Sequence, residues 1–236
     1  MVSYLAGSEA EQAAAVIGFD RAEYIERDGA QAYLFSNAHD RVIACRGTEP
    51  NEWNDIKADA NALTDLAETV GRVHRGFKRE VDDIWPYLEE HLTEADERAL
   101  WVTGHSLGGA MAQIVAGRCR LADIPAWPTE VYTYGSPRVG NTRYVAYNDV
   151  KHVRWVNNND VVTKVPPAWL RYRHRGDRMY LDADGDVRAK ISKRQRVRDQ
   201  WRGFKQGLKQ RKIDHFSDHA IAAYVEHLTR AVNSTR

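Results

Sequence analysis

The sequence has few cysteines, no long apolar run and almost no net charge. Only Cys45 and Cys119 occur among the 236 residues, and both lie in predicted elements among apolar neighbours. This excludes a disulfide-stapled scaffold, and we expect two buried free thiols. No apolar run approaches the roughly 20 residues that a membrane-spanning helix needs. The formal net charge of +1 excludes the strongly basic composition of a nucleic-acid-binding chain, so we expect no nucleic-acid partner.

The sequence also shows no sign of a signal peptide, an internal repeat or an interdomain linker. The first ten residues, Met1–Ala10, contain neither a basic stretch nor an apolar core, so we expect no secretory signal peptide. This leaves the cellular location open, with the cytoplasm favoured over a non-classical export route. No period repeats, and no Gly/Ser-rich or Pro-rich linker divides the chain. We therefore expect a single domain over residues 1–236.

Apolar patterns place the secondary structure. Short apolar runs between turn residues predict strands at Gln31–Phe35, Arg41–Cys45, Leu100–Thr103, Val131–Tyr134 and Val153–Val156. Helices are predicted over Glu9–Ile17, Phe77–Leu92 and Met111–Arg120, the second from apolar residues recurring every three or four positions. Strands that alternate with helices predict an α/β fold, with a mostly parallel central sheet and helices on both faces.

One pentapeptide matches a catalytic motif. Gly104-His105-Ser106-Leu107-Gly108 matches G-x-S-x-G, and it stands between a predicted buried strand and a predicted helix. In that setting the sharp turn strains the serine backbone and lifts its Oγ clear of the sheet, as in a nucleophile elbow. The following helix points its N-terminus at the serine and favours negative charge there. Ser106 is therefore the predicted nucleophile of an α/β-hydrolase fold.

Further motifs in a fixed order extend this interpretation. They are Cys45-Arg46-Gly47-Thr48, Val73-His74-Arg75-Gly76-Phe77, the elbow at Ser106, Tyr134-Gly135-Ser136-Pro137-Arg138-Val139-Gly140-Asn141 and Asn159-Asp160-Val161-Val162. Together the sequence resembles the class 3 (fungal-type) lipase family of α/β-hydrolases, from about Gln31 to Pro167 and again near His219. The resemblance implies a serine carboxylic-ester hydrolase, either a triacylglycerol lipase or an esterase, that works through an acyl-enzyme.

A serine nucleophile needs a histidine base, which a carboxylate orients. Asp160 is the predicted acid, because it follows a strand on a loop and matches the family's aspartate. His219 is the predicted base, since it stands just before the last predicted helix, as the family's histidine does. His215, four residues earlier, is the alternative. His174 resembles a strand position of the family, and His227 falls inside the last helix.

An oxyanion hole requires two hydrogen-bond donors. The backbone N–H of Leu107, the residue after the nucleophile, is the first predicted donor. By resemblance, Thr48 supplies the second through its N–H and its hydroxyl. His74 and Ser136 also match family positions, and we expect structural roles for both.

No motif calls for a metal ion or a cofactor. Asp182-Ala183-Asp184-Gly185-Asp186 resembles the start of a calcium loop, but Val187 stands at the sixth position and Lys193 at the twelfth. A hairpin turn is the favoured interpretation. We expect neither a metal site nor a bound cofactor.

The substrate is less determined than the chemistry. Resemblance points to acylglycerols, with phospholipase A1 and feruloyl-type esterase activities as alternatives. The family's lid would fall within Trp53–Arg72, where Ala60, Ala62, Leu63 and Leu66 form only a small apolar face. A non-enzyme alternative is a lipid- or partner-binding protein on an inactive hydrolase scaffold. A missing triad residue would indicate it, and none is missing.

One segment departs from the family. Residues 188–212 carry eleven Lys and Arg residues against the single acidic Asp199, so the segment has a charge of +10 and the rest of the chain −9. An apolar stripe runs through it, formed by Val197, Trp201, Phe204 and Leu208. A basic helix with such a face is typical of interfacial membrane binding, and we expect it to contact anionic lipid peripherally. The alternative is that the stripe packs on the acidic body of the protein.

Overall fold

The computed structural model describes residues 7–47, 64–68, 70–93, 96–122, 124–189 and 217–234. The predicted oxyanion residue Thr48 lies outside these ranges. So do the alternative base His215 and the four predicted docking residues, Val197, Trp201, Phe204 and Leu208. Their predicted roles therefore stay predictions.

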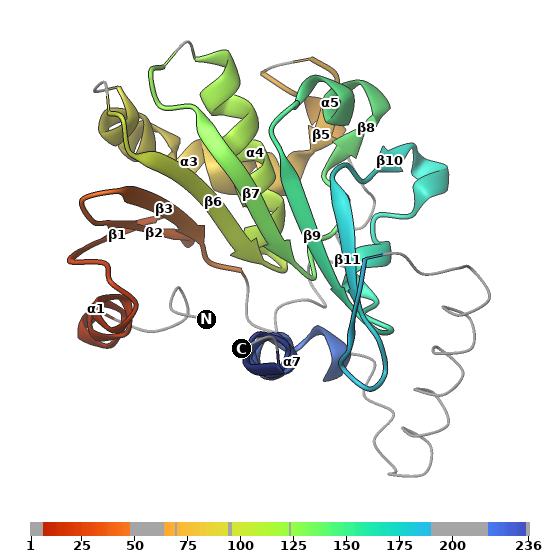
Figure 1. Ribbon diagram of the computed structural model, residues 1–236. Helices are drawn as coiled ribbons and strands as arrows, with labels where there is room; N and C mark the ends of the chain where they lie inside the picture. Colours follow the sequence, from red (N-terminus) through yellow and green to blue (C-terminus); the bar gives the residue numbers. More distant parts are fainter. Residues whose placement is uncertain are drawn as a thin grey trace.

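A twisted eight-stranded sheet forms the centre of the molecule, in the order β1-β2-β3-β6-β7-β9-β11-β12 (Figure 1). Its strands are β1 (Arg21–Arg27), β2 (Ala30–Ser36), β3 (Asp40–Cys45), β6 (Ala99–His105), β7 (Pro128–Tyr134), β9 (His152–Asn157), β11 (Asp177–Leu181) and β12 (Val187–Arg188). The five strands from β3 to β11 run parallel to one another, and the pairs at both edges are antiparallel. The prediction of a mostly parallel sheet is confirmed, and the edge strand β1 is an addition to it.

Helices cover both faces of this sheet, as predicted. Figure 1 shows α3 (Arg75–Leu92) and α4 (Leu107–Leu121) on one face, and α1 (Gly7–Val16) and α7 (Ile221–Ser234) on the other. Strand β2 shows how one sequence serves two faces. Ala32 and Leu34 belong to the core under α3 and α4, whereas Tyr33 and Phe35 pack with α1. Successive residues of a strand point to opposite faces of the sheet, so the alternation assigns these four side chains to the two cores.

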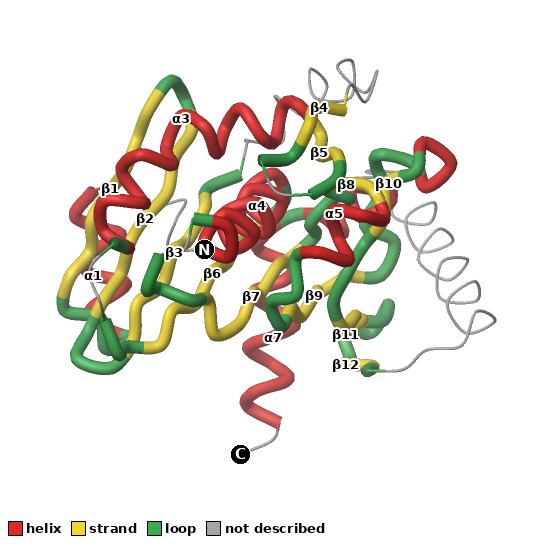
Figure 2. Tube along the Cα trace, turned by 90° about the horizontal axis from the view of Figure 1, so that it is seen from above, coloured by secondary structure: helices red, strands yellow, loops and turns green. Residues whose placement is uncertain are grey.

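The predicted helical stripe forms the centre of the larger core. Its residues Phe77, Val81, Ile84, Leu88 and Leu92 are all buried on one side of α3. They pack with α4, whose first turns are apolar all round and buried between α3 and the sheet (Figure 2). A helix that is apolar on every side must be enclosed, which is why α4 lies in the middle of this layer.

A second, four-stranded sheet lies beside the first, in the order β10-β8-β5-β4. It is built from β10 (Tyr172–Arg173), β8 (Gly140–Asn141), β5 (Arg72–His74) and β4 (Thr64–Leu66), with α5 (Thr142–Tyr147) following β8. Short 3-10 turns occur at Val162–Lys164, Ala168–Leu170 and Ser217–His219. Leu66 belongs to β4 and is exposed, so it does not contribute to a helical lid face; Ala60, Ala62 and Leu63 lie outside the described residues.

The aspartate-rich stretch after β11 is a hairpin turn, as predicted. Tyr180 pairs with Arg188 and Leu181 with Val187 across it. The Asp182 carboxylate accepts hydrogen bonds from the backbone N–H groups of Asp184 and Asp186 and from Nε of Arg188. These donors occupy the oxygens that a calcium loop would offer to the ion. Arg188, the first residue of the predicted basic segment, is therefore part of the sheet edge.

Both cysteines are buried and free, as predicted. Burial raises the pKa of each thiol to about 12, so neither is a reactive thiolate at neutral pH. Among the helices that the structure describes, none has the length and apolar character to cross a membrane.

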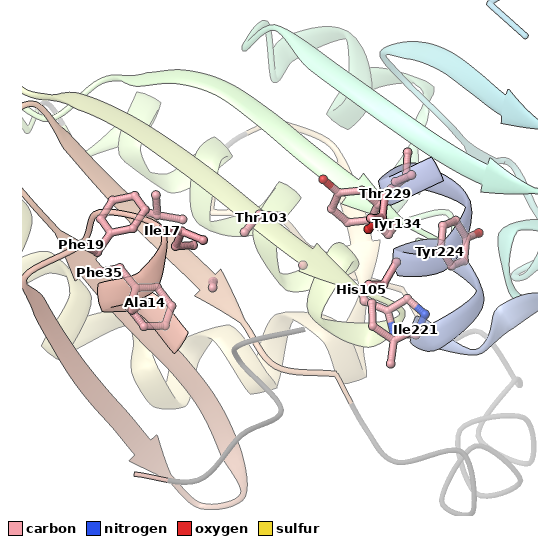
Figure 3. Close-up of a pocket in the computed structure, with 15 residues that line it drawn as sticks. Ala14, Ile17, Phe19, Phe35, Thr103, His105, Tyr134, Ile221, Tyr224 and Thr229 are labelled. Carbon is pink, nitrogen blue, oxygen red and sulfur yellow. The ribbon is translucent and has the colours of Figure 1, made fainter. Parts of the chain in front are cut away.

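An apolar cavity of about 370 Å³ lies between α1 and α7, on the face of the sheet that they share (Figure 3). Ile17 and Phe35 line one end, and His105 and Tyr224 line the other. The second pair of side chains also contacts the triad described below, so this cavity adjoins the rear of the candidate site.

Buried histidines make the fold sensitive to acid. Burial lowers the pKa of His152 to about 3, whereas an unfolded histidine titrates near 6.5. Between these values the unfolded chain binds more protons than the folded one. The free energy of unfolding therefore falls as the pH falls, by about 1.4 kcal/mol per pH unit for each such histidine.

We expect His152→Gln to make this pH dependence shallower, by about 1.4 kcal/mol per pH unit between roughly pH 4 and 6. Urea unfolding across that range measures the slope. His39→Gln, at an exposed histidine, is the matched control and should leave the slope unchanged. Equal slopes for His152→Gln and the wild type would contradict a neutral, buried His152.

Candidate active site

Ser106 sits in the strained turn that the motif predicts. It follows the last residue of β6 directly and precedes the first residue of α4, with φ 60° and ψ −127°. This backbone conformation is costly for any residue other than glycine, at about 1–3 kcal/mol. Its N–H donates to the carbonyl of Tyr134 at the end of β7, and its carbonyl accepts from Gly109 N–H in α4. The strand and the helix thus hold the turn from both sides.

The two glycines of the motif are required by close backbone contacts. A Cβ on Gly104 would lie 2.1 Å from the carbonyl oxygen of Gly108. A Cβ on Gly108 would lie 2.3 Å from the carbonyl oxygen of Cys45, at the end of β3. Neither neighbour can move, because both are backbone atoms of the central sheet and helix. The G-x-S-x-G spacing therefore follows from the tight strand–turn–helix packing.

The structure brings the three predicted catalytic residues together. Nε2 of His219 lies 2.8 Å from Oγ of Ser106, and Nδ1 lies 2.9 Å from Oδ2 and 3.1 Å from Oδ1 of Asp160. Since the ionised carboxylate can only accept, Nδ1 carries the proton and Nε2 is left to accept from the serine hydroxyl. This is the arrangement in which a serine can lose its proton to a base.

The Asp160 carboxylate is fully buried and accepts two further hydrogen bonds. Oδ1 accepts from the N–H of Val162 at 2.9 Å, and Oδ2 accepts from the hydroxyl of Tyr224 at 2.7 Å. The same hydroxyl accepts from Asn157 N–H at 2.9 Å. Burial and the nearby Asp160 raise the pKa of Tyr224 well above its usual value, so it remains a donor. Tyr224 is thus a positioning residue for the carboxylate.

Three successive asparagines tie the loop of Asp160 to the loop of His219. Asn157 donates from Nδ2 to the carbonyl oxygen of Asp218 at 3.0 Å. The Asp218 carboxylate accepts from Nδ2 of Asn158 at 3.3 Å and from the N–H of Asn159 at 3.2 Å. Asn158 adopts a φ of 34°, a conformation that asparagine tolerates better than most residues. These bonds fix the residue next to the histidine relative to the acid.

His105 supports the histidine from behind. Its ring stacks on that of His219 with centroids 4.7 Å apart, and Nε2 lies 2.7 Å from the carbonyl oxygen of His219. Burial and the neighbouring His219 lower the pKa of His105 to about 3, so it is neutral. Since a carbonyl only accepts, the single proton of the neutral ring is on Nε2. His105 thus holds both the ring plane and the backbone of the base.

The predicted oxyanion donor Leu107 is the first residue of α4, a position whose N–H has no acceptor inside its own helix. It adjoins Ser106, as the prediction requires. The described chain ends at Gly47 in the segment that leads to Thr48. A Cβ on Gly108 would meet backbone atoms of Cys45 and Arg46 in that segment. The second predicted donor therefore belongs to a segment that starts beside the elbow.

The histidines set aside by the sequence analysis have other contacts. His174 lies 2.8 Å from the carbonyl oxygen of Thr163 through Nε2, and His227 lies 3.2 Å from Oδ1 of Asn157 through Nδ1. His74 caps the N-terminus of α3 by accepting from the N–H of Phe77, which fits the structural role expected of it. Ser136 accepts from Gln113 in a turn and is likewise structural.

Sequence reasoning did not assign three residues that shape this site: Tyr224, His105 and Gly135. Gly135 has a φ of 61°, and a Cβ there would lie 2.7 Å from Oδ2 of Asp160 and 2.9 Å from Nδ1 of His219. Its signal was the Gly-Ser-Pro motif, and that of Tyr224 was its place five residues after the base. His105 is the variable residue of the elbow motif and carries no signal of its own.

Comparison with known proteins identifies the family. The profile of the family described as lipase (class 3) matches residues 42–169, more than half of the chain. The chain belongs to the class 3 lipase family. The matched range includes Ser106 and Asp160 but ends before His219, so the assignment of the base depends on the geometry above. The α/β-hydrolase fold predicted from the sequence is confirmed.

Relatives and a solved structure agree with class 3 lipase membership. Toxin TseL of Vibrio cholerae is 27% identical over an alignment of 189 residues, which covers 62% of this chain and 29% of that protein. Secreted mono- and diacylglycerol lipase 1 of Fusarium solani is 33% identical over an alignment of 149 residues, which covers 60% of this chain and 44% of that protein. The chain therefore spans less than half the length of either relative. The crystal structure of a lipase from Rhizopus microsporus var. chinensis superposes with a TM-score of 0.58 at 27% identity, covering 68% of this chain and 61% of that one.

The assignment of the base predicts a sharp contrast between two histidines. His219→Ala should lower kcat on a soluble ester by about 10⁶-fold, because Ser106 then has no group to accept its proton. His215→Ala should keep activity near that of the wild type. Initial rates with the purified variants measure both. Near wild-type rates for His219→Ala would overturn the assignment in favour of His215.

Removal of one hydroxyl tests the positioning role of Tyr224. Tyr224→Phe should lower kcat by about 10–100-fold at nearly unchanged KM, since a hydrogen bond to a charged group contributes about 1.5–3 kcal/mol. Tyr144→Phe is the matched control, because Tyr144 is equally buried and its hydroxyl contacts the carbonyl of Gln113. Equal kcat losses in the two variants would show a general effect on packing and contradict the role.

Proposed function

We propose that this protein hydrolyses carboxylic esters of lipids, acylglycerols in the first place, through an acyl-enzyme on Ser106. The observation that carries the proposal is the continuous line of contacts from Oγ of Ser106 through the ring of His219 to the Asp160 carboxylate. Membership of the class 3 lipase family supports the substrate class. The Fusarium relative is named a mono- and diacylglycerol lipase, which supports the same class.

The proposed reaction has two halves. Oγ of Ser106 attacks the ester carbonyl while Nε2 of His219 takes its proton, and the imidazolium that forms faces the buried Asp160 carboxylate. The carbonyl oxygen becomes an oxyanion, which accepts from the N–H of Leu107 and, in the predicted hole, from Thr48. His219 then protonates the leaving alkoxide, which departs as an alcohol. Water, activated by the same histidine, releases the fatty acid and restores Ser106.

The proposed site stabilises the negative charge that develops on the oxyanion in the transition state. The partial positive charge at the N-terminus of α4 points at the position of the oxyanion. Asp160 is enclosed by its donors and has no exposed surface. Fixed dipoles in a water-poor site stabilise the transition state without having to reorient, which is the largest contribution in most serine hydrolases.

Two variants, each lacking the hydroxyl of one serine, test this proposal. Wild type and Ser136→Ala should react with a fluorophosphonate probe and cleave triacylglycerol emulsions, whereas Ser106→Ala should do neither, with kcat lower by about 10⁶-fold. Ser136 is a suitable control because it is buried close to the elbow but bonded to Gln113. Labelling or cleavage that persists in Ser106→Ala would overturn the nucleophile.

Parallel assays on long-chain emulsions, short-chain esters and phospholipid vesicles identify the substrate. Cleavage of long-chain emulsions that depends on Ser106 would support the acylglycerol proposal. Ser106-dependent cleavage confined to short soluble esters would contradict a lipase and indicate an esterase. Faster cleavage of vesicles than of either would favour the phospholipase A1 alternative.

A further inference from the structure

A second cavity, of about 260 Å³, is lined by residues of the Asp160 loop, Asn158, Thr163 and Lys164, and by positive side chains. We call it the arginine cavity. Its cationic residues are Arg138, Arg154, Lys164 and Arg178, with His174 beside them, and its described lining contains no aspartate or glutamate. The remaining residues of the described lining are neutral, so positive charge predominates in that lining.

Arg154 is the residue that needs an explanation. It is 8% exposed, it lies on the inner strand β9, and its buried Nε has no hydrogen-bond partner among the described residues. The other two buried arginines of the described chain each form an ion pair with a carboxylate, although Nε and Nη2 of Arg41 also have no hydrogen-bond partner among the described residues. Arg41 lies 3.2 Å from Asp96, and Nε of Arg118 lies 2.8 Å from Glu68. A buried charge without a partner is costly, so Arg154 lacks something that its two counterparts have.

The neighbours of Arg154 increase this cost. Arg178 on β11 is its direct partner in the parallel pairing of the two strands, and like charges placed opposite each other destabilise a sheet. Burial first, then Arg178 and Arg138, lower the pKa of Arg154 to about 10. An anion seated between the two guanidinium groups would attract both of them and offset their mutual repulsion.

The hydrogen-bonding groups of the cavity define the kind of anion. Guanidinium groups offer planar pairs of N–H donors that match the oxygens of a phosphate or a carboxylate. Nε2 of His174 is occupied by the carbonyl of Thr163, which leaves Nδ1 as a buried acceptor with no partner among the described residues. A protonated phosphate oxygen can donate to such a nitrogen while its other oxygens accept from the arginines. A carboxylate ionised at neutral pH has no proton to donate.

We propose that the arginine cavity binds a phosphate group, held between Arg154 and Arg178 with His174 accepting from one phosphate hydroxyl. The phosphate can be free in solution or part of a lipid headgroup, since both offer the same oxygens. The cavity also borders the site: Thr163, in its lining, donates to the carbonyl of Asp160 at 2.9 Å, and Asn158 donates to Asp218. A bound phosphate would therefore stabilise the loop that carries the acid.

Titration of the full chain with inorganic phosphate, in a phosphate-free buffer of low salt, tests the proposal. Calorimetry should give a Kd below about 1 mM, and phosphate should raise Tm by mass action. Arg154→Met should abolish both effects, and its Tm without phosphate should equal or exceed that of the wild type, since an unpaired buried charge is removed. Arg178→Gln, at a less buried position, should weaken binding by about 10-fold or more.

Arg41→Met is the matched control, the same substitution at a buried arginine that has a carboxylate partner. It should lower Tm and leave phosphate binding unchanged. No phosphate binding by the wild type in calorimetry, or equal affinity in wild type, Arg154→Met and Arg178→Gln, would overturn the proposal for free phosphate.

Vesicles distinguish the two sources of the phosphate group. Co-sedimentation with vesicles of phosphatidylcholine and phosphatidic acid, at about 4:1, supports the headgroup source if Arg154→Met reduces it. Inorganic phosphate binding that depends on Arg154, with vesicle binding that does not, supports the soluble source. If neither ligand depends on Arg154, the arginine cavity is not a phosphate site. None of these measurements uses ester hydrolysis, so they stand apart from the proposed function.

Discussion

The buried carboxylate of Asp160 is the constraint on which the rest of the candidate site depends. A carboxylate with no exposed surface must have its hydrogen bonds met by the protein, and three groups meet them, two of which come from a distant segment. His219 and Tyr224 come from the C-terminal end of the chain, and Val162 comes from the loop of Asp160 itself. To satisfy this one group, α7 must dock against the end of β9, and that docking places the base beside Ser106.

The elbow and the carboxylate are held by different physical means. Ser106 is kept in place by close packing of backbone, with glycines at positions where a Cβ would overlap carbonyl oxygens. Asp160 and His219 are kept in place by directional hydrogen bonds from asparagine, tyrosine and histidine side chains. Packing determines where the nucleophile lies, since the central sheet cannot shift. Hydrogen bonding determines how the acid and base are oriented.

The buried arginines of the described chain have two kinds of surroundings, with and without a carboxylate nearby. Arg41 lies on β3 and Arg118 on α4, and each has a carboxylate from another segment. Arg154 and its cross-strand neighbour Arg178 share a cavity whose described lining has no acid. The two acids come from the segments before β6 and between β4 and β5, and neither is in the described lining of the arginine cavity. The loop that carries Asp160 contributes to that lining through Asn158 and Thr163.

Much of this protein was determined by the sequence alone, namely those features that depend on neighbours along the chain. The parallel core strands, the helical stripe from Phe77 to Leu92 and the strand–turn–helix at Ser106 each follow from local periodicity or from glycine spacing, and the structure places them as predicted. Ordered motifs also indicated the family and nominated Asp160 and His219. The short strands β4, β8 and β10 were not predicted, because two- or three-residue strands have no period to detect. The seven-residue strand β1 was not predicted either, because most of its residues are exposed and it has no alternating apolar pattern.

Only the tertiary structure decided which distant groups meet. Ser106 and His219 are separated by 113 positions, and Asp160 and His219 by 59, so no local pattern could distinguish the contacts of His219 from those of His174 or His227. Some groups could be interpreted only from the assembled sheet. They are the hydroxyl of Tyr224, the ring of His105 and the Nε of Arg154, which has no hydrogen-bond partner among the described residues. Burial removes water from these groups, and the free energy of each then depends on the partner that the fold supplies.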